Sequence, residues 1–239
     1  GSFGTHKSFE LSEDLEGLIL SKVWSNLTFY YFTSQEPDTQ GYFFIINHRD
    51  NQTMITVVSG LPRSGTSMMM KMLEAGGKNV LTDNLRTADE DNLKGYYEDE
   101  RVKSLHQDNA WISDAEGQVV KVISYLLKYL PDGHEYRIIF MERKIDEVLA
   151  SQKKMMQRRG EPTDDVPDSV MTGIFKKHLD EIYAWLSNQP SMQVIYISYN
   201  NSLNEPENSA ESVNNFLGGG MDIEKMMQVV DPSLYRQRK

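Results

Sequence analysis

The stretch that most constrains the fold is "ITVVSGLPRSGTSMMMKMLEAGG", residues 55–77. An apolar run typical of a buried strand leads into a loop with Gly60 and Gly65, and the loop leads into a helical pattern. Glycine-rich loops of this kind bind phosphate, because loop amides and the helix N-terminus favour an anion. Residue 66, where a nucleotide triphosphatase carries lysine, is Thr66. The stretch therefore predicts phosphate binding without lysine-assisted chemistry. The alternative is a strand–turn–helix in which glycine serves only the turn.

The rest of the chain repeats a strand-then-helix order. Apolar, β-prone runs predict strands at residues 54–60, 118–123, 136–143 and 192–198. Amphipathic stretches predict helices at residues 65–77, 124–131, 145–159, 169–189 and 206–219. Apolar strands separated by helices are typical of a parallel sheet covered on both faces. We therefore expect a three-layer α/β fold, a parallel sheet flanked by helices, similar to that of the P-loop nucleotide triphosphatases.

A chain of 239 residues is long enough for one α/β domain with a full core, which we place at residues 54–239. Residues 1–53 are expected to pack on the same domain, in a role that the sequence does not reveal. An amphipathic stretch predicts a helix at residues 11–27, and two aromatic runs favour a hairpin within residues 28–52. Three turn-rich segments are expected to be mobile loops: residues 82–95, 160–168 and 200–206.

Composition argues against several classes of protein. A formal net charge of −10 argues against a nucleic-acid-binding protein, which needs a basic surface to displace counterions from phosphates. Without cysteine, the chain has neither disulfides nor a thiol nucleophile. No segment is long and apolar enough to span a bilayer and no signal peptide is visible, so we expect a cytoplasmic protein. The chain begins "GSFGTH" without an initiator methionine, so upstream sequence could be missing.

The residues of the loop narrow its chemistry. Residues 62–67 read "PRSGTS", so the positive charge lies on Arg63, within the loop itself. This stretch resembles the phosphosulfate loop of the sulfotransferases that use 3′-phosphoadenosine 5′-phosphosulfate (PAPS), a family that needs no triphosphate and no metal. The resemblance implies that Arg63 lies near the oxygen that bridges phosphate and sulfate. It also implies which residues hold the 5′-phosphate: Ser64, Gly65, Thr66 and Ser67.

A second pair of residues carries the same resemblance. In the family, an arginine at a strand end and a serine eight residues later bind the 3′-phosphate of PAPS, and Arg143 and Ser151 have this spacing in "FMERKIDEVLAS". Arginine offers a planar fork to phosphate, and a helical serine adds a hydrogen bond. The chain lacks the family's proline two residues after the arginine and the "RKGxxG" element near the C-terminus, and is closest to bacterial-type members. The resemblance covers residues 54–239. A solvated surface arginine is the alternative for Arg143.

The segment of residues 89–111 contains two candidates for a catalytic base. Transfer of a sulfuryl group to an alcohol needs a base for the hydroxyl proton and a cation near the departing oxygen. Bacterial members carry a similar "GYYE" or "GYWE" stretch that places an acid near the acceptor, which implies Glu98 as the first candidate; His106 is the second. Partial burial beside Tyr96 and Tyr97 would raise the pKa of Glu98. Alternatively, "YEDERV" is only the acidic start of a helix.

Two further candidates lie at strand ends. Lys121 lies in the apolar run "VVKVI", so its ammonium needs a partner if it points inward. The family carries a lysine at a similar strand end near the sulfuryl group, which implies a catalytic cation; an outward lysine that reaches water is the alternative. Tyr199 follows "MQVIYIS", where the family places a tyrosine against the adenine. Packing of Tyr199 on a loop is the alternative.

We therefore expect a PAPS-dependent sulfotransferase that transfers a sulfuryl group to a hydroxyl or amine acceptor and releases adenosine 3′,5′-bisphosphate (PAP). A small nucleotide or metabolite kinase with an atypical loop is one alternative, although it would need magnesium and a lysine on the phosphates. A sulfotransferase-like binding module without activity is the other. The sequence does not reveal whether the acceptor is a small molecule, a carbohydrate or a lipid, and it does not reveal the oligomeric state.

Overall fold

The computed structural model describes three stretches of the chain: residues 54–83, 97–161 and 166–231. All three belong to one compact unit of residues 48–239. The helix expected at residues 11–27 and the hairpin expected within residues 28–52 lie outside the described residues, as does most of the loop expected at residues 82–95.

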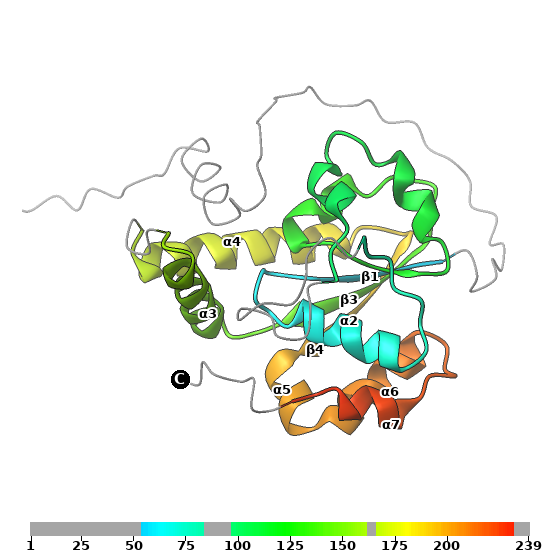
Figure 1. Cartoon of the computed structure of the whole chain (residues 1–239). Coiled ribbons are helices and arrows are strands. Elements are labelled where there is room, and N and C mark those ends of the chain that lie inside the picture. Colours follow the sequence, from blue (N-terminus) through cyan, green and yellow to red (C-terminus); the bar gives the residue numbers. More distant parts are fainter. Residues whose placement is uncertain (1–53, 84–96, 162–165, 232–239) are drawn as a thin grey trace, which may run out of the picture. The chain divides into compact units, whose positions relative to one another are not determined.

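Four parallel strands form the central sheet (Figure 1). They are β1 (Ile55–Gly60), β2 (Val119–Lys121), β3 (Tyr136–Glu142) and β4 (Met192–Ser198), in the spatial order β2-β1-β3-β4. The expected parallel sheet is therefore confirmed. Val58 pairs with Lys121, and Gly60 pairs with Met141. Because the strands run the same way, their carboxyl ends lie along one edge, where open α/β sheets bind their ligands.

One face of the sheet packs on a methionine-rich helix and on helices from the C-terminal part of the chain. The helices on this face are α2 (Thr66–Ala75), α6 (Pro206–Phe216) and α7 (Ile223–Gln228). Val58 and Ile139, side by side on β1 and β3, are buried against Met69 and Met72 of α2. Methionine fills irregular gaps in a core, which explains its abundance in this helix.

The opposite face packs on α4 (Asp168–Leu186), which lies above the sheet in Figure 1. Its Tyr183 ring contacts the rings of Phe140 on β3 and Tyr196 on β4, with ring centroids 5.4 and 5.3 Å apart. α3 (Ile145–Arg158) connects β3 to α4 and packs against α4. With helices on both faces of a parallel sheet, the expected three-layer α/β fold is confirmed.

One predicted loop is wrong. Residues 200–206, expected to be mobile, form α5 (Tyr199–Asn204) and the start of α6. Ser198 Oγ accepts a hydrogen bond from Asn201 N at 3.3 Å and so caps α5. Leu203 is buried in the core and anchors this short helix. Helix α7 was not expected.

Between α2 and β3, the described residues form short 3-10 helices in addition to β2. They are η1 (Glu100–Ser104), η2 (Ala110–Ala115) and η3 (Ser124–Tyr129), the last of which takes the place of the helix expected at residues 124–131. Among the described residues, no helix has the length and apolar character needed to cross a membrane.

Candidate active site

The carboxyl edge of the sheet brings together residues from four parts of the chain. Arg63 lies in the loop that follows β1, and Lys121 is the last residue of β2. Arg143 directly follows β3, and Tyr199 directly follows β4. The strand order therefore gathers three cationic side chains and one aromatic ring along one edge of the sheet.

The loop between β1 and α2 has the backbone shape of an anion-binding nest. Arg63 and Gly65, on either side of Ser64, have left-handed φ values of 71° and 101°. Turns of this kind direct successive amide groups to one side, and α2 begins at Thr66 directly afterwards. A left-handed conformation is unfavourable for Arg63, which is not glycine, and strain of this kind is concentrated at functional sites. The loop and the helix N-terminus are thus suited to hold a phosphate.

Ser64 leaves a buried hydroxyl at the base of this loop. The residue is 1% exposed, and its Oγ makes no hydrogen bond within the described part of the chain. The hydroxyl lies over Gly60, where an added Cβ would come within 2.5 Å of Ser64 Oγ. A buried hydroxyl without a partner is unfavourable, so a ligand oxygen at this point would be stabilising.

The two sequence motifs meet at Arg63. Its Nε donates a hydrogen bond to Ser151 Oγ of α3 at 3.0 Å. Its carbonyl oxygen accepts a hydrogen bond from Arg143 Nη1 at 2.9 Å. Both residues that the resemblance assigns to a 3′-phosphate therefore lie beside the loop that it assigns to the 5′-phosphate.

Arg143 is held by a buried carboxylate and an aromatic ring. Its Nε donates to Glu147 Oε2 at 3.0 Å, and Glu147 is fully buried. The Arg143 guanidinium carbon lies 4.4 Å from the centroid of the Tyr199 ring. Asn200 Nδ2 lies 3.1 and 3.3 Å from the two oxygens of Glu147. Because a buried charge is stable only when paired, these contacts fix the orientation of the guanidinium.

Lys121 points into the protein and links the phosphate loop to Glu98. The residue is 8% exposed. Its Nζ lies 3.1 Å from Glu98 Oε1 and 3.4 Å from Ser67 Oγ, in the first turn of α2. The alternative of an outward lysine is therefore wrong, and Glu98 is the carboxylate partner that a buried ammonium requires.

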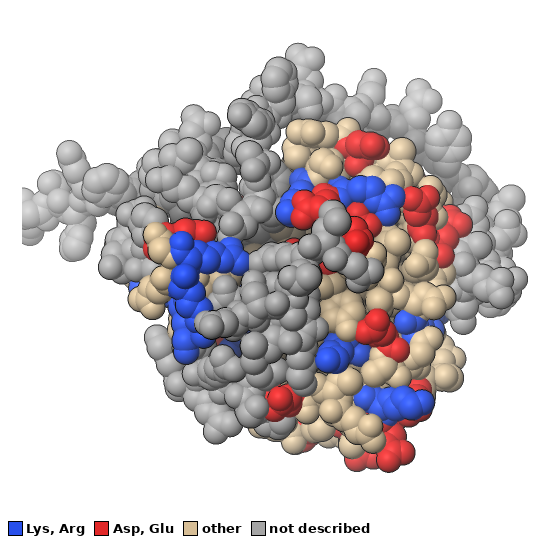
Figure 2. All heavy atoms as spheres, viewed as in Figure 1, with Lys and Arg blue, Asp and Glu red and all other residues tan. Residues whose placement is uncertain are grey.

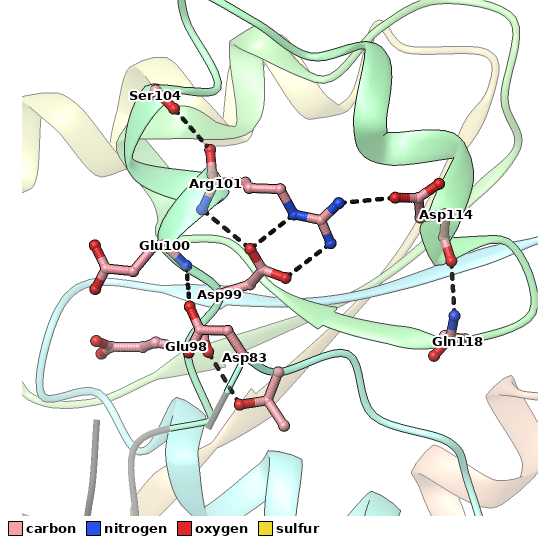
Figure 3. Close-up of polar contacts among 9 residues, drawn as sticks. Asp83, Glu98, Asp99, Glu100, Arg101, Ser104, Asp114 and Gln118 are labelled. Atoms are coloured by element: carbon pink, nitrogen blue, oxygen red, sulfur yellow. Dashed lines mark hydrogen bonds and ion pairs between the residues drawn. The ribbon is translucent and has the colours of Figure 1, made fainter. Parts of the chain in front are cut away.

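Hydrogen bonds to the Glu98 carbonyl oxygen and to Asp99 fix the backbone at Glu98 (Figure 3). Its carbonyl oxygen accepts hydrogen bonds from Thr82 Oγ1 at 3.0 Å and from Asp83 N at 3.2 Å. The next residue, Asp99, binds the Arg101 guanidinium at 3.0 and 2.9 Å. The Glu98 carboxylate lies beside Lys121. Because its side chain is 27% exposed, it also reaches solvent.

The residue before Glu98 is also anchored. Tyr97 has a left-handed φ of 50°, and its hydroxyl donates a hydrogen bond to Glu74 of α2. Burial and that bond raise the pKa of Tyr97 well above its usual value, so the phenol remains a donor. The alternative of an acidic helix start holds for Asp99, whose carboxylate caps η1. Glu98 lies outside that helix. Tyr96 lies outside the described residues.

His106 packs against an aromatic ring, and His178 is buried beside a serine. The His106 ring packs edge-on against Tyr129, with ring centroids 5.9 Å apart. His178 of α4 is buried, and its Nε2 lies 2.9 Å from Ser124 Oγ. Burial, assisted by the positive charge of Lys128, lowers the pKa of His178 to about 4. His178 is therefore neutral at physiological pH and connects α4 to η3.

The charge on the described surface is uneven. Figure 2 shows lysines and arginines gathered at the left edge, where Figure 1 places α3, whereas acidic and basic residues are mixed elsewhere on this face. The second half of α3 carries Lys153, Lys154 and Arg158. Among the described residues, no group of three or more histidines and carboxylates is arranged to hold a metal ion.

Glu147 and Asn200 contribute to this site but were not predicted from the sequence. Glu147 follows Arg143 by four positions, a spacing at which side chains on or beside a helix meet, so this signal was available. Asn200 had no comparable signal, because its segment was expected to be a loop. Tyr97 was expected only to shield Glu98 and is also an anchor for the backbone.

Comparison with known proteins identifies relatives at the family level. A family model described as "Sulfotransferase family" matches residues 85–222, more than half of the chain. No curated protein sequence matched the chain.

Solved structures with a related arrangement share little sequence identity. The sulfotransferase domain from the curacin biosynthetic pathway is 16% identical, with 74% of this chain and 77% of that chain covered and a TM-score of 0.45. The sulfotransferase domain of the Synechococcus PCC 7002 olefin synthase is 14% identical, with 83% and 88% covered and a TM-score of 0.46. A mouse sulfotransferase complexed with PAP is 17% identical, with 75% and 63% covered and a TM-score of 0.45. The family assignment rests on the family match alone.

Proposed function

Since the chain belongs to the sulfotransferase family and is an enzyme that transfers sulfuryl groups, we propose that its donor is PAPS. The acceptor is a hydroxyl or an amine on a small molecule, a carbohydrate or a lipid. PAPS carries an activated sulfuryl group on its 5′-phosphate and a second phosphate on its 3′-oxygen. Its binding therefore needs two phosphate sites within one nucleotide's reach of each other.

One observation carries the proposal: Arg143 and Ser151 both contact Arg63 of the phosphate loop. The loop amides, Ser64, Gly65, Thr66 and Ser67 would hold the 5′-phosphate, and the buried Ser64 hydroxyl is suited to that task. Arg143 and Ser151 would hold the 3′-phosphate, since a planar guanidinium matches phosphate geometry. Two anion sites that share one arginine fit a nucleotide bisphosphate.

The contact between Lys121 and Glu98 supports a division of catalytic roles. In the transfer, a bond forms between sulfur and the acceptor atom, and the bond between sulfur and the phosphate oxygen breaks. Lys121, beside the phosphate loop, and Arg63, within it, would stabilise negative charge that develops near the departing oxygen. Glu98 would take the proton from the acceptor.

Glu98 is favoured over His106 as the base. Glu98 contacts Lys121, which in turn lies beside Ser67 at the loop, so the carboxylate is connected to the phosphate site through Lys121. The contact described for His106 is with the Tyr129 ring. A base must lie within hydrogen-bond reach of the acceptor, and the acceptor must lie near the sulfuryl group.

Replacement of Arg143 tests the 3′-phosphate site. We expect Arg143→Ala to weaken binding of PAP about 10- to 100-fold, because a charged hydrogen-bond donor to phosphate is lost. AMP lacks the 3′-phosphate, so its affinity should fall by less than about threefold on the same grounds. Isothermal titration with both ligands measures the two effects.

Two further variants serve as controls for Arg143→Ala. Arg143→Lys keeps the charge but not the planar fork, and we expect an intermediate loss for PAP. Arg158→Ala removes an exposed arginine from the end of α3 and should leave both affinities unchanged. Equal losses for PAP and AMP in Arg143→Ala would contradict the assignment.

A further inference from the structure

The surroundings of Tyr199 differ from those of a residue that stacks on a nucleobase. The residue is 7% exposed. Its ring lies against the phosphate loop, because a Cβ added to Gly65 would come within 2.3 Å of Tyr199 Cδ2. The centroid of the same ring lies 4.4 Å from the Arg143 guanidinium carbon. Most of the ring surface is therefore already covered by the protein itself.

The adjacent residue holds Arg143 indirectly. Asn200 Nδ2 reaches both oxygens of Glu147, and Glu147 Oε2 accepts a hydrogen bond from Arg143 Nε. The first two residues of α5 thus act on the same guanidinium, Tyr199 through its ring and Asn200 through the carboxylate. Arg143 Nη1 donates to the carbonyl oxygen of Arg63, so the guanidinium is also fixed to the loop.

These contacts explain why the buried pair is stable. A guanidinium over an aromatic ring gains electrostatic stabilisation, and the gain is larger when the cation is withdrawn from water. Glu147 is completely buried, so it needs both Arg143 and Asn200 to satisfy its oxygens. Burial also raises the pKa of the Tyr199 phenol, which keeps the ring neutral.

We propose that Tyr199, with Asn200 and Glu147, forms a clamp that orients Arg143 toward the 3′-phosphate. Tyr199 is then a positioning residue that acts through Arg143, and the base of the nucleotide is recognised elsewhere. This inference rests on the proposed function, because it takes PAP as the ligand. It assigns Tyr199 to phosphate discrimination, where the family resemblance implied contact with adenine.

The affinities of PAP and AMP for Tyr199→Leu test the clamp. We expect PAP to bind about tenfold more weakly, because the cation–π contact that orients Arg143 is lost, and AMP to change by less than about twofold. Tyr199→Phe keeps the ring and should bind both ligands within about twofold of the unmodified protein. An adenine contact would instead weaken PAP and AMP by the same factor, and that result, or an unchanged PAP affinity, would overturn the clamp.

A double-mutant cycle shows whether Tyr199 acts through Arg143. In an Arg143→Ala background, Tyr199→Leu should cause no further loss of PAP affinity, since there is no guanidinium left to orient. A further loss of the full size would overturn the proposal. Circular dichroism and thermal unfolding establish that each variant is folded before titration.

Asn200→Ala provides a second route if Tyr199→Leu does not fold. It removes the amide that holds Glu147 and leaves the ring in place, so a smaller but still PAP-selective loss is expected. Unchanged or equal affinities for PAP and AMP would overturn the clamp. An unmodified protein that does not prefer PAP to AMP would overturn the proposed function itself, whereas a PAP preference that is undiminished in Tyr199→Leu would overturn only the clamp.

Discussion

Lys121 is the residue that most clearly connects the proposed phosphate site to the proposed catalytic base. A buried ammonium is strongly unfavourable unless a carboxylate and other acceptors replace its water. The Glu98 carboxylate and the Ser67 hydroxyl, which lies in the first turn of α2 beside the phosphate loop, provide these partners. The ion pair that stabilises Lys121 therefore also holds Glu98, the candidate base, near the phosphate loop.

Replacement of Glu98 tests its role as base. We expect Glu98→Gln to lower kcat for sulfuryl transfer roughly 100- to 10,000-fold, the usual contribution of general base catalysis, while PAP affinity changes little. Glu100→Gln is a matched control, because Glu100 lies two residues away and its carboxylate pairs with Lys103 at the surface. The measurement is the initial rate with PAPS and an acceptor found by screening. An unchanged kcat in Glu98→Gln would remove Glu98 from the mechanism.

Individual residues were predictable where spacing carried the information. The family resemblance carried by the eight-residue interval between Arg143 and Ser151 implied that the two residues act together, and both contact Arg63; their role in binding phosphate stays a prediction. The apolar strand around Lys121 implied a buried partner but not which one, because Glu98 comes from a segment 23 residues earlier. The contact between the Tyr199 ring and Arg143 was not predictable, because it depends on how β3 and β4 pair.

At the scale of elements, the buried strands were the most predictable part. The apolar character of β1 and β3 follows from their burial in the centre of the sheet, whereas the edge strand β4 is only partly buried. Helix α5 was missed because its sequence, rich in asparagine, is typical of turns; tertiary contacts of Leu203 and the cap from Ser198 stabilise it instead. Short helices that depend on such contacts have no periodic signal of their own.

The attachment of α4 to η3 predicts a pH dependence of stability. The pKa of His178 is lowered to about 4 in the folded protein, against about 6.5 in an unfolded chain. Between these values the unfolded chain binds a proton that the folded protein does not, so the free energy of unfolding falls as the pH falls. The loss should reach roughly 3 kcal/mol by pH 4.

His178→Gln should remove this contribution, since glutamine does not titrate and can still bond to Ser124. Urea unfolding at pH 7, 6 and 5 measures the slope for the variant and for the unmodified protein. Asn188→Gln is the control, because Asn188 is exposed just beyond the end of α4 and does not titrate, so the slope should stay nearly unchanged. The same slope in all three proteins would contradict the role assigned to His178.

At the scale of the whole molecule, the site is a small cationic region in an acidic protein. The chain carries a net charge of −10, yet Arg63, Lys121 and Arg143 lie along one edge of the sheet. They come from three separate loops or strand ends, so the anion site exists only when the chain is folded. A ligand that binds this site must therefore stabilise the folded state as a whole.

The most direct test of a PAPS site is the thermal midpoint of the unmodified protein with PAP, with AMP, and with ATP plus magnesium. At about a hundred times its dissociation constant, a ligand adds roughly 2.7 kcal/mol of stability, which corresponds to about 5–10 °C for a domain of this size. We predict that PAP without metal gives the largest rise and AMP a smaller one. A rise with magnesium and ATP alone, and none with PAP, would contradict the account.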